Sequence, residues 1–279
     1  MPKETGISKA VRVWLSVGTS VFIGAAGAGC TDPGGDAARN PADAGDFAAQ
    51  AAGGSEPPGP SAGGEGEGEG ASTADPVSDD VEYLHQLGQV RGHLAAFTAL
   101  HRLGAHELSM THAKHPESEL YAGLVPAFAA RGKAGFAEEL DVLTDAVGKG
   151  ADVDAAYADV VNAIRENEPD ADFATRLMAI ATVARTAGNE FAIGVADDGT
   201  VVNAHEYQDA YGFLTAAREM LGDNEATDAQ EAQALALAEQ QLQIALAEFD
   251  TLTANRLDGH ASVIHGAAAR IEIEANMLR

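Results

Sequence analysis

Apolar residues recur every three or four positions through most of the chain after residue 78, which is the spacing of one face of an α-helix. The first stripe of this kind consists of Leu84, Leu87, Val90, Leu94, Phe97 and Leu100. The strict alternation of apolar and polar residues that is typical of strands is nearly absent from this region. The pattern therefore predicts an all-α fold.

Capping and breaking residues divide the region into separate helices. Asp79 lies three residues before Glu82, which is a capping-box arrangement at the start of the first helix. The expected helices include 79–103, 105–114, 135–147, 153–167, 172–186 and 227–257, of which the last is the longest. Residues 191–202 are expected to form a short hairpin around an Asp-Gly turn. We expect seven or eight antiparallel helices, packed as one bundle domain over residues 79–279.

The first 29 residues have the organisation of a targeting segment. Basic residues near the start precede an apolar run at 13–29, which is too short and too rich in glycine for a spanning helix. The run ends at Gly27-Ala28-Gly29-Cys30, which resembles the lipobox of bacterial lipoproteins with glycine in place of the usual leucine. The resemblance implies that 1–29 is a lipoprotein signal peptide and that Cys30, once lipidated, anchors the protein. The alternative is an ordinary secretory signal or an uncleaved anchor, followed by an incidental thiol.

Residues 30–78 have the composition of a tether. Positions 31–78 contain 11 Gly and 6 Pro, and they carry nine acidic residues against a single arginine. Such a stretch cannot bury enough apolar surface to offset the entropy of ordering the chain. We therefore predict a disordered, acidic spacer between the membrane anchor and the helical domain.

Charge, cysteine content and motifs exclude several functions. The chain has 17 basic and 43 acidic residues, a net charge of −26, whereas a nucleic-acid binder needs a basic surface for phosphates. The single cysteine excludes a disulfide framework and a cysteine-based zinc finger. The sequence has no nucleophile elbow, phosphate loop or His-Glu-x-x-His motif, so we expect neither an enzyme nor a nucleic-acid partner.

The histidines are the clearest candidates for a functional site. Six of the nine lie within 31 positions, namely His85, His93, His101, His106, His112 and His115. Neutral imidazole binds transition metals, and carboxylates complete such sites. His112, His115 and Glu119 follow one another at spacings of three and four, so a turn at Pro116 would bring them into one coordination sphere. The alternative is that these are ordinary surface or core histidines.

Two segments carry a resemblance to a known group of proteins. Residues 112–121 (HAKHPESELY) and 206–214 (EYQDAYGFL) are similar to periplasmic helical proteins of bacterial iron uptake. These include imelysin-like lipoproteins and the periplasmic domain fused to some iron permeases. The resemblance implies helices whose histidine and acidic side chains receive an iron or copper ion before transport. It points to the two histidines and Glu119 of the first segment and to Glu206 of the second.

We therefore expect a lipid-anchored protein on the periplasmic side of the cell envelope, with a non-catalytic role in handling iron or copper. The expected metal ligands are His93, His112, His115 and Glu119, with Glu206 as a facing carboxylate. Affinity should fall as the histidines become protonated, at about pH 6. The expected partners are the membrane, through the lipid on Cys30, and an envelope transporter or another envelope protein. The alternative is a structural or protein-interaction lipoprotein that has no metal site.

Overall fold

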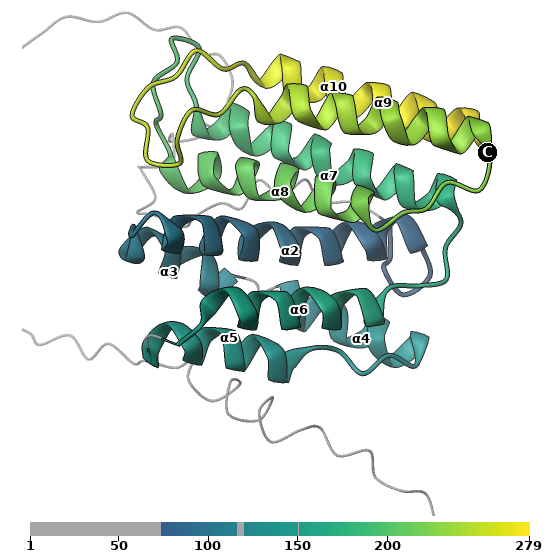
Figure 1. Cartoon of the computed structure of the whole chain (residues 1–279), viewed down its shortest axis with the longest axis horizontal. Coiled ribbons are helices and arrows are strands. Elements are labelled where there is room, and N and C mark those ends of the chain that lie inside the picture. The colour runs from purple at the N-terminus through teal and green to yellow at the C-terminus, as the bar shows by residue number, and fades with distance from the viewer. Residues whose placement is uncertain (1–73, 116–119, 150) are drawn as a thin grey trace, which may run out of the picture.

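The computed structural model describes residues 74–115, 120–149 and 151–279 (Figure 1). The predictions for the signal peptide, for Cys30 and for nearly all of the tether fall outside these residues, and so does Glu119. The helices are α2 (Asp80–Arg102), α3 (His106–His115), α4 (Tyr121–Arg131), α5 (Ala137–Lys149), α6 (Val153–Asn167), α7 (Phe173–Gly194), α8 (Ala204–Gly222), α9 (Ala229–Leu246) and α10 (Ala261–Met277). The all-α prediction is confirmed, with nine helices in the described part against the seven or eight expected.

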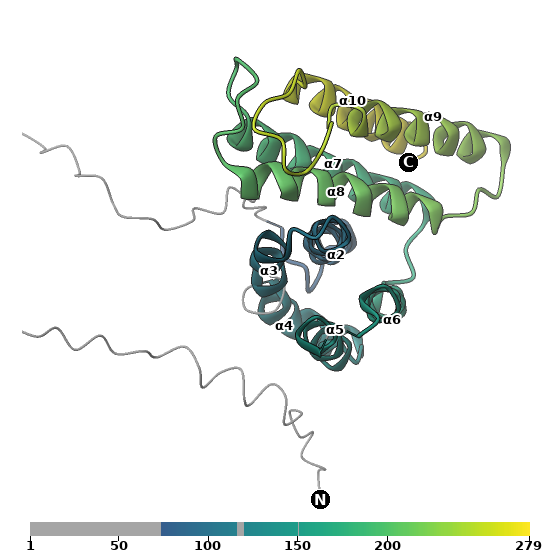
Figure 2. The ribbon, with the colours of Figure 1, turned by 60° about the vertical axis from the view of Figure 1, so that its left-hand side comes forward.

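The helices form two groups on either side of α2 (Figure 2). In the first group, α7 contacts α8 and α10, and α9 contacts the same two helices, which makes a four-helix bundle. In the second group, α3, α4 and α6 contact α2, and α5 packs on α6. Because α2 also packs along α7 and α8, it belongs to both groups. No helix in the part of the chain that the structure describes is long and apolar enough to cross a membrane.

α2 is buried on more sides than its apolar stripe predicts. The stripe accounts for contact with helices on one side of α2 only, but seventeen of the 23 residues of α2 are buried. The opposite face carries the small residues Gly88, Gly92 and Ala96 at four-residue spacing, and these allow α7 and α8 to come close. Small residues do not stand out in a hydrophobic pattern, so the sequence indicated only one of the two faces.

Polar caps determine where several helices start. The Asp79 carboxylate accepts a hydrogen bond from the Glu82 N–H at 3.0 Å, so α2 begins where the capping pattern predicts. Asp152 caps α6 in the same way, and α6 spans Val153–Asn167, which is the predicted range. Local sequence is sufficient to place these boundaries.

The predicted end of α7 is wrong, and the predicted hairpin is confirmed only next to its turn. α7 does not end near residue 186 but continues to Gly194, because Phe191 is buried in the core of the four-helix bundle. The hairpin is reduced to a single bridge between Val195 and Val201 around the expected turn. Burial of an aromatic residue therefore extends the helix into the segment that was expected to be a strand.

The predicted end of α9 is also wrong, since α9 ends at Leu246 rather than at 257. The segment that follows crosses the start of α8. There the Tyr207 hydroxyl donates a hydrogen bond to the Thr251 carbonyl at 3.1 Å. The Gln208 amide donates one to the Leu252 carbonyl at 3.0 Å. Hydrogen bonds to another helix thus replace those that a longer α9 would make within itself.

Candidate metal centre

α2 and α8 cross at two facing glycines. A Cβ atom on Gly212 would overlap the carbonyl oxygen of Gly92, and one on Gly92 would overlap the Phe213 ring. Glycine at both positions is what allows the two backbones to approach so closely. The crossing places His93 and Asp209, which neighbour these glycines along α2 and α8, side by side.

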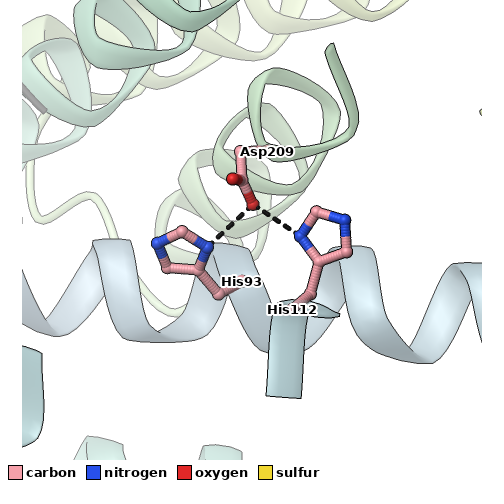
Figure 3. Close-up of side chains that lie close together, drawn as sticks. All are labelled: His93, His112 and Asp209. Carbon is pink, nitrogen blue, oxygen red and sulfur yellow. Dashed lines mark hydrogen bonds and ion pairs between the residues drawn. The ribbon is translucent and has the colours of Figure 1, made fainter. Parts of the chain in front are cut away.

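Three side chains from three helices converge beside this crossing (Figure 3). Asp209 Oδ1 on α8 lies 2.7 Å from His93 Nδ1 on α2 and 2.8 Å from His112 Nδ1 on α3. The ligand atoms of the three residues all lie within 4.8 Å of one another. The exposed fractions of the side chains are 1% for His93, 0% for His112 and 2% for Asp209. We call these three residues the His–Asp cluster.

His112 is held at both of its ring nitrogens. Its Nδ1 faces Asp209, and its Nε2 lies 2.8 Å from Gln208 Oε1. The Gln208 amide nitrogen donates to the Leu252 carbonyl, which fixes the amide with its oxygen toward His112. Asp209 and Gln208 Oε1 are both acceptors, so the two hydrogen bonds together require a proton on each ring nitrogen. If Nδ1 lost its proton, Nε2–H would still donate to Gln208, and this is how metal-binding histidines are commonly oriented.

Asp209 is ionised at the centre of the cluster. Burial alone would raise the pKa of its carboxyl, but the charge of His93 and the hydrogen bonds from His112 and His93 lower the pKa well below its usual range. Phe213 covers the site on one side, with its ring edge-on to that of His93 at 5.0 Å between centroids. Charges attract more strongly in such a dry environment, so the carboxylate would attract a divalent cation as it attracts the imidazoles.

The cluster has the donor atoms of a transition-metal site, but these atoms lie closer together than they would around a bound ion. Two imidazole nitrogens and one carboxylate oxygen suit ions such as iron, copper and zinc. Donors of a tetrahedral ion that is bound at about 2.1 Å lie about 3.4 Å apart. The N–O distances in the cluster are 2.7 and 2.8 Å, so an ion would replace the hydrogen-bonding protons and move the donors apart.

The structure brings together two of the five predicted ligands, His93 and His112. Glu206 is not part of the cluster, because its Oε1 accepts a 3.4 Å hydrogen bond from Asn203 Nδ2 at the start of α8. The side chain of His115 and the whole of Glu119 lie outside what the structure describes, so these two assignments stay predictions.

Asp209 is the candidate ligand that the sequence pattern did not indicate. The obvious apolar face of α8, which includes Tyr207 and Leu214, packs into the core of the four-helix bundle. Asp209 lies on a second buried face together with Gly212 and Phe213, turned toward α2. The signal that could have revealed this face is the glycine in the middle of α8, because an interior glycine often marks close backbone approach.

Comparison with known proteins concerns the C-terminal half. Residues 166–276 match the family model of the iron permease-associated 4-helix bundle domain. The match covers α7 to α10 almost completely and includes Asp209 and Gln208, whereas His93 and His112 precede it. Searches of curated proteins and of solved structures gave no match. The four-helix bundle of this chain is therefore similar to a helical domain associated with iron permeases, as the iron-uptake part of the sequence resemblance predicted.

Proposed function

We propose that this protein binds an iron or copper ion at the His–Asp cluster and serves iron uptake at the cell envelope without catalysing a reaction. The observation that carries the proposal is the convergence of two imidazoles and one carboxylate from α2, α3 and α8 at a buried point. The match to an iron permease-associated domain favours iron as the ion, because the carboxylate lies within the matched residues.

Binding would exchange protons for the ion. In the hydrogen-bonded cluster, the Nδ1 atoms of His93 and His112 share Oδ1 of Asp209. A metal ligand must be a deprotonated nitrogen, so the ion would displace the Nδ1 protons while Gln208 keeps the His112 ring in place. We therefore expect binding to release protons and to weaken in acid.

The proposed location is the periplasmic side of the envelope, with the chain anchored by a lipid on Cys30. The lipobox-like sequence and the acidic, Gly/Pro-rich segment after it support an anchor followed by a spacer. The proposed partner is an iron permease or another envelope transporter, since the matched domain is one associated with permeases. The net charge of −26 would add a modest attraction for cations, which physiological salt screens beyond about 8 Å.

One observation favours the alternative, a protein-interaction lipoprotein with no metal site. Both ring nitrogens of His112 already have side-chain partners, so the His–Asp cluster can also be understood as a hydrogen-bond network that ties α2 and α3 to α8. In that case the cluster only stabilises the fold, and the function lies on the protein surface.

Calorimetry distinguishes the two functions. The full chain, purified in detergent, is titrated with Fe²⁺ without oxygen and separately with Cu²⁺ and Zn²⁺, in two buffers that differ in their heats of ionisation. For the wild type we expect one ion per chain and proton release. For His93→Ala and His112→Ala we expect the affinity for the ion to fall by about 100-fold or more. His85→Ala is the matched control, because His85 is a buried histidine of α2 that bonds Thr186 outside the cluster. Equal heats in the wild type and in both cluster variants would favour the alternative.

A further inference from the structure

A third imidazole borders the His–Asp cluster on its more exposed side. His205 lies in the first turn of α8, where its N–H donates to Oδ1 of Asn203, the N-cap residue, at 3.1 Å. Asp209 is four residues later, so both side chains project from the same face of the helix. The His205 ring stacks on the His112 ring at 4.3 Å between centroids, with an angle of 13° between the planes.

The two oxygens of Asp209 serve different histidines. Oδ1 faces His93 and His112, whereas Oδ2 lies 3.2 Å from His205 Nε2. The side chain of His205 is 18% exposed, against 0–2% for the three cluster residues. His205 is therefore the residue nearest to solvent on this side, but its Nε2 atom is itself buried, so capture of a cation requires the ring to turn outward.

Thr111 orients the His205 ring for such a role. The Thr111 hydroxyl donates its proton to the Leu108 carbonyl at 2.7 Å. Its oxygen can then only accept from His205 Nδ1–H, which lies 3.4 Å away. The tautomer with the proton on Nδ1 turns the lone pair of Nε2 toward Asp209 Oδ2 at 3.2 Å, so no hydrogen bond joins these two atoms and a cation between them would bind both. Gln208 holds His112 in a corresponding way, through its other ring nitrogen.

We propose that His205 is the outer ligand of the centre: with Asp209 Oδ2 it captures a divalent cation and passes it to the His–Asp cluster. This inference rests on the proposed function and concerns the route of the ion. Stepwise replacement of bound water by imidazole and carboxylate avoids moving a bare ion into a buried site, which would be strongly unfavourable. Asp209 takes part in both steps, because one carboxylate can bind the ion through either oxygen.

The route predicts a kinetic effect of His205 with little effect at equilibrium. A residue that assists both capture and release changes the two rates alike. In stopped-flow absorbance with Cu²⁺ as the probe, we expect His205→Ala to lower the association and dissociation rates together by about tenfold, the lower end of the range seen among variants of one site. The dissociation constant and the stoichiometry should change little. His106→Ala, an exposed histidine of α3, is the control and should keep wild-type rates.

His205→Gln separates metal binding from positioning. Glutamine is long enough to donate a hydrogen bond to Asp209 but is a poor metal ligand, so it should be as slow as alanine. Wild-type rates in His205→Gln would mean that His205 only positions Asp209, and this would overturn the proposal. Unchanged rates in His205→Ala, with weak binding in His112→Ala, would overturn it while the proposed function stands. Tight binding by both His93→Ala and His112→Ala would overturn both.

Discussion

The two groups of helices on either side of α2 are packed in different ways. In the core on the side of α7 to α10, twelve of 27 residues are alanine, so the helices can lie close along their whole length. In the core of α2 to α6, three of 16 residues are alanine and four are aromatic, so larger side chains fill the space between the helices. The match to the iron permease-associated domain covers the first group only.

The candidate site belongs to neither group by itself. The buried imidazoles come from α2 and α3, and the carboxylate comes from α8. Further along the same contact, Arg91 of α2 is fully buried and pairs with Glu219 of α8 at 3.3 Å and with Asp223, the C-cap residue of α8, at 3.1 Å. Polar pairs are thus found where the two groups meet, and the matched bundle supplies only half of each.

The largest effect is expected from removing the carboxylate that joins the two groups. Asp209→Ala leaves the buried imidazoles of His93 and His112 without the carboxylate that they share, so we expect the free energy of unfolding to fall by about 3–5 kcal/mol in urea denaturation. Asp159→Ala, at an exposed position of α6, is the control and should stay within about 0.5 kcal/mol of the wild type. Equal losses in the two variants would show that the contact between the groups does not depend on the cluster.

A smaller loss of stability is expected from pushing the backbones of α2 and α8 apart. In Gly212→Ala the new Cβ meets the Gly92 carbonyl, which cannot turn away as a flexible side chain can. We expect the free energy of unfolding to fall by about 1–3 kcal/mol. Gly266→Ala is a matched control, since Gly266 lies within α10 with nothing within 4 Å of its Cβ position. Alanine there should be neutral or stabilise by up to about 1 kcal/mol, and an equal loss at both sites would contradict close packing at Gly212.

The smallest effect on stability is expected from a histidine whose surroundings lie entirely within the α7–α10 bundle. His265 of α10 packs against α7, where burial and the charge of Arg185 lower the pKa of its imidazole. As the pH falls, the unfolded chain takes up this proton before the folded chain does, so stability is lost below the ordinary histidine pKa. We expect His265→Gln to lose less stability than the wild type between about pH 7 and about pH 5. An identical loss, measured by urea denaturation at both pH values, would assign it to other groups.

Local sequence was sufficient for much of the fold. Capping by Asp79 and Asp152 and the spacing of apolar residues placed the starts of α2 and α6, because these signals act within one turn of helix. The histidine content of the N-terminal helices likewise pointed to His93 and His112, since residue type and clustering can be read without the fold.

Tertiary structure alone decided which carboxylate the histidines meet. Glu206 and Asp209 are one turn apart on α8, and only the glycine-mediated crossing with α2 places Asp209 opposite the imidazoles. Tertiary contacts also end α9 at Leu246, because the carbonyls of the next segment accept hydrogen bonds from side chains of α8 instead of continuing the helix. The amino-acid sequence thus determined the helices and the supply of imidazoles, since those depend on neighbours along the chain. Their meeting with Asp209 depends on contacts between residues about a hundred positions apart, such as His112 and Asp209, which no local pattern encodes.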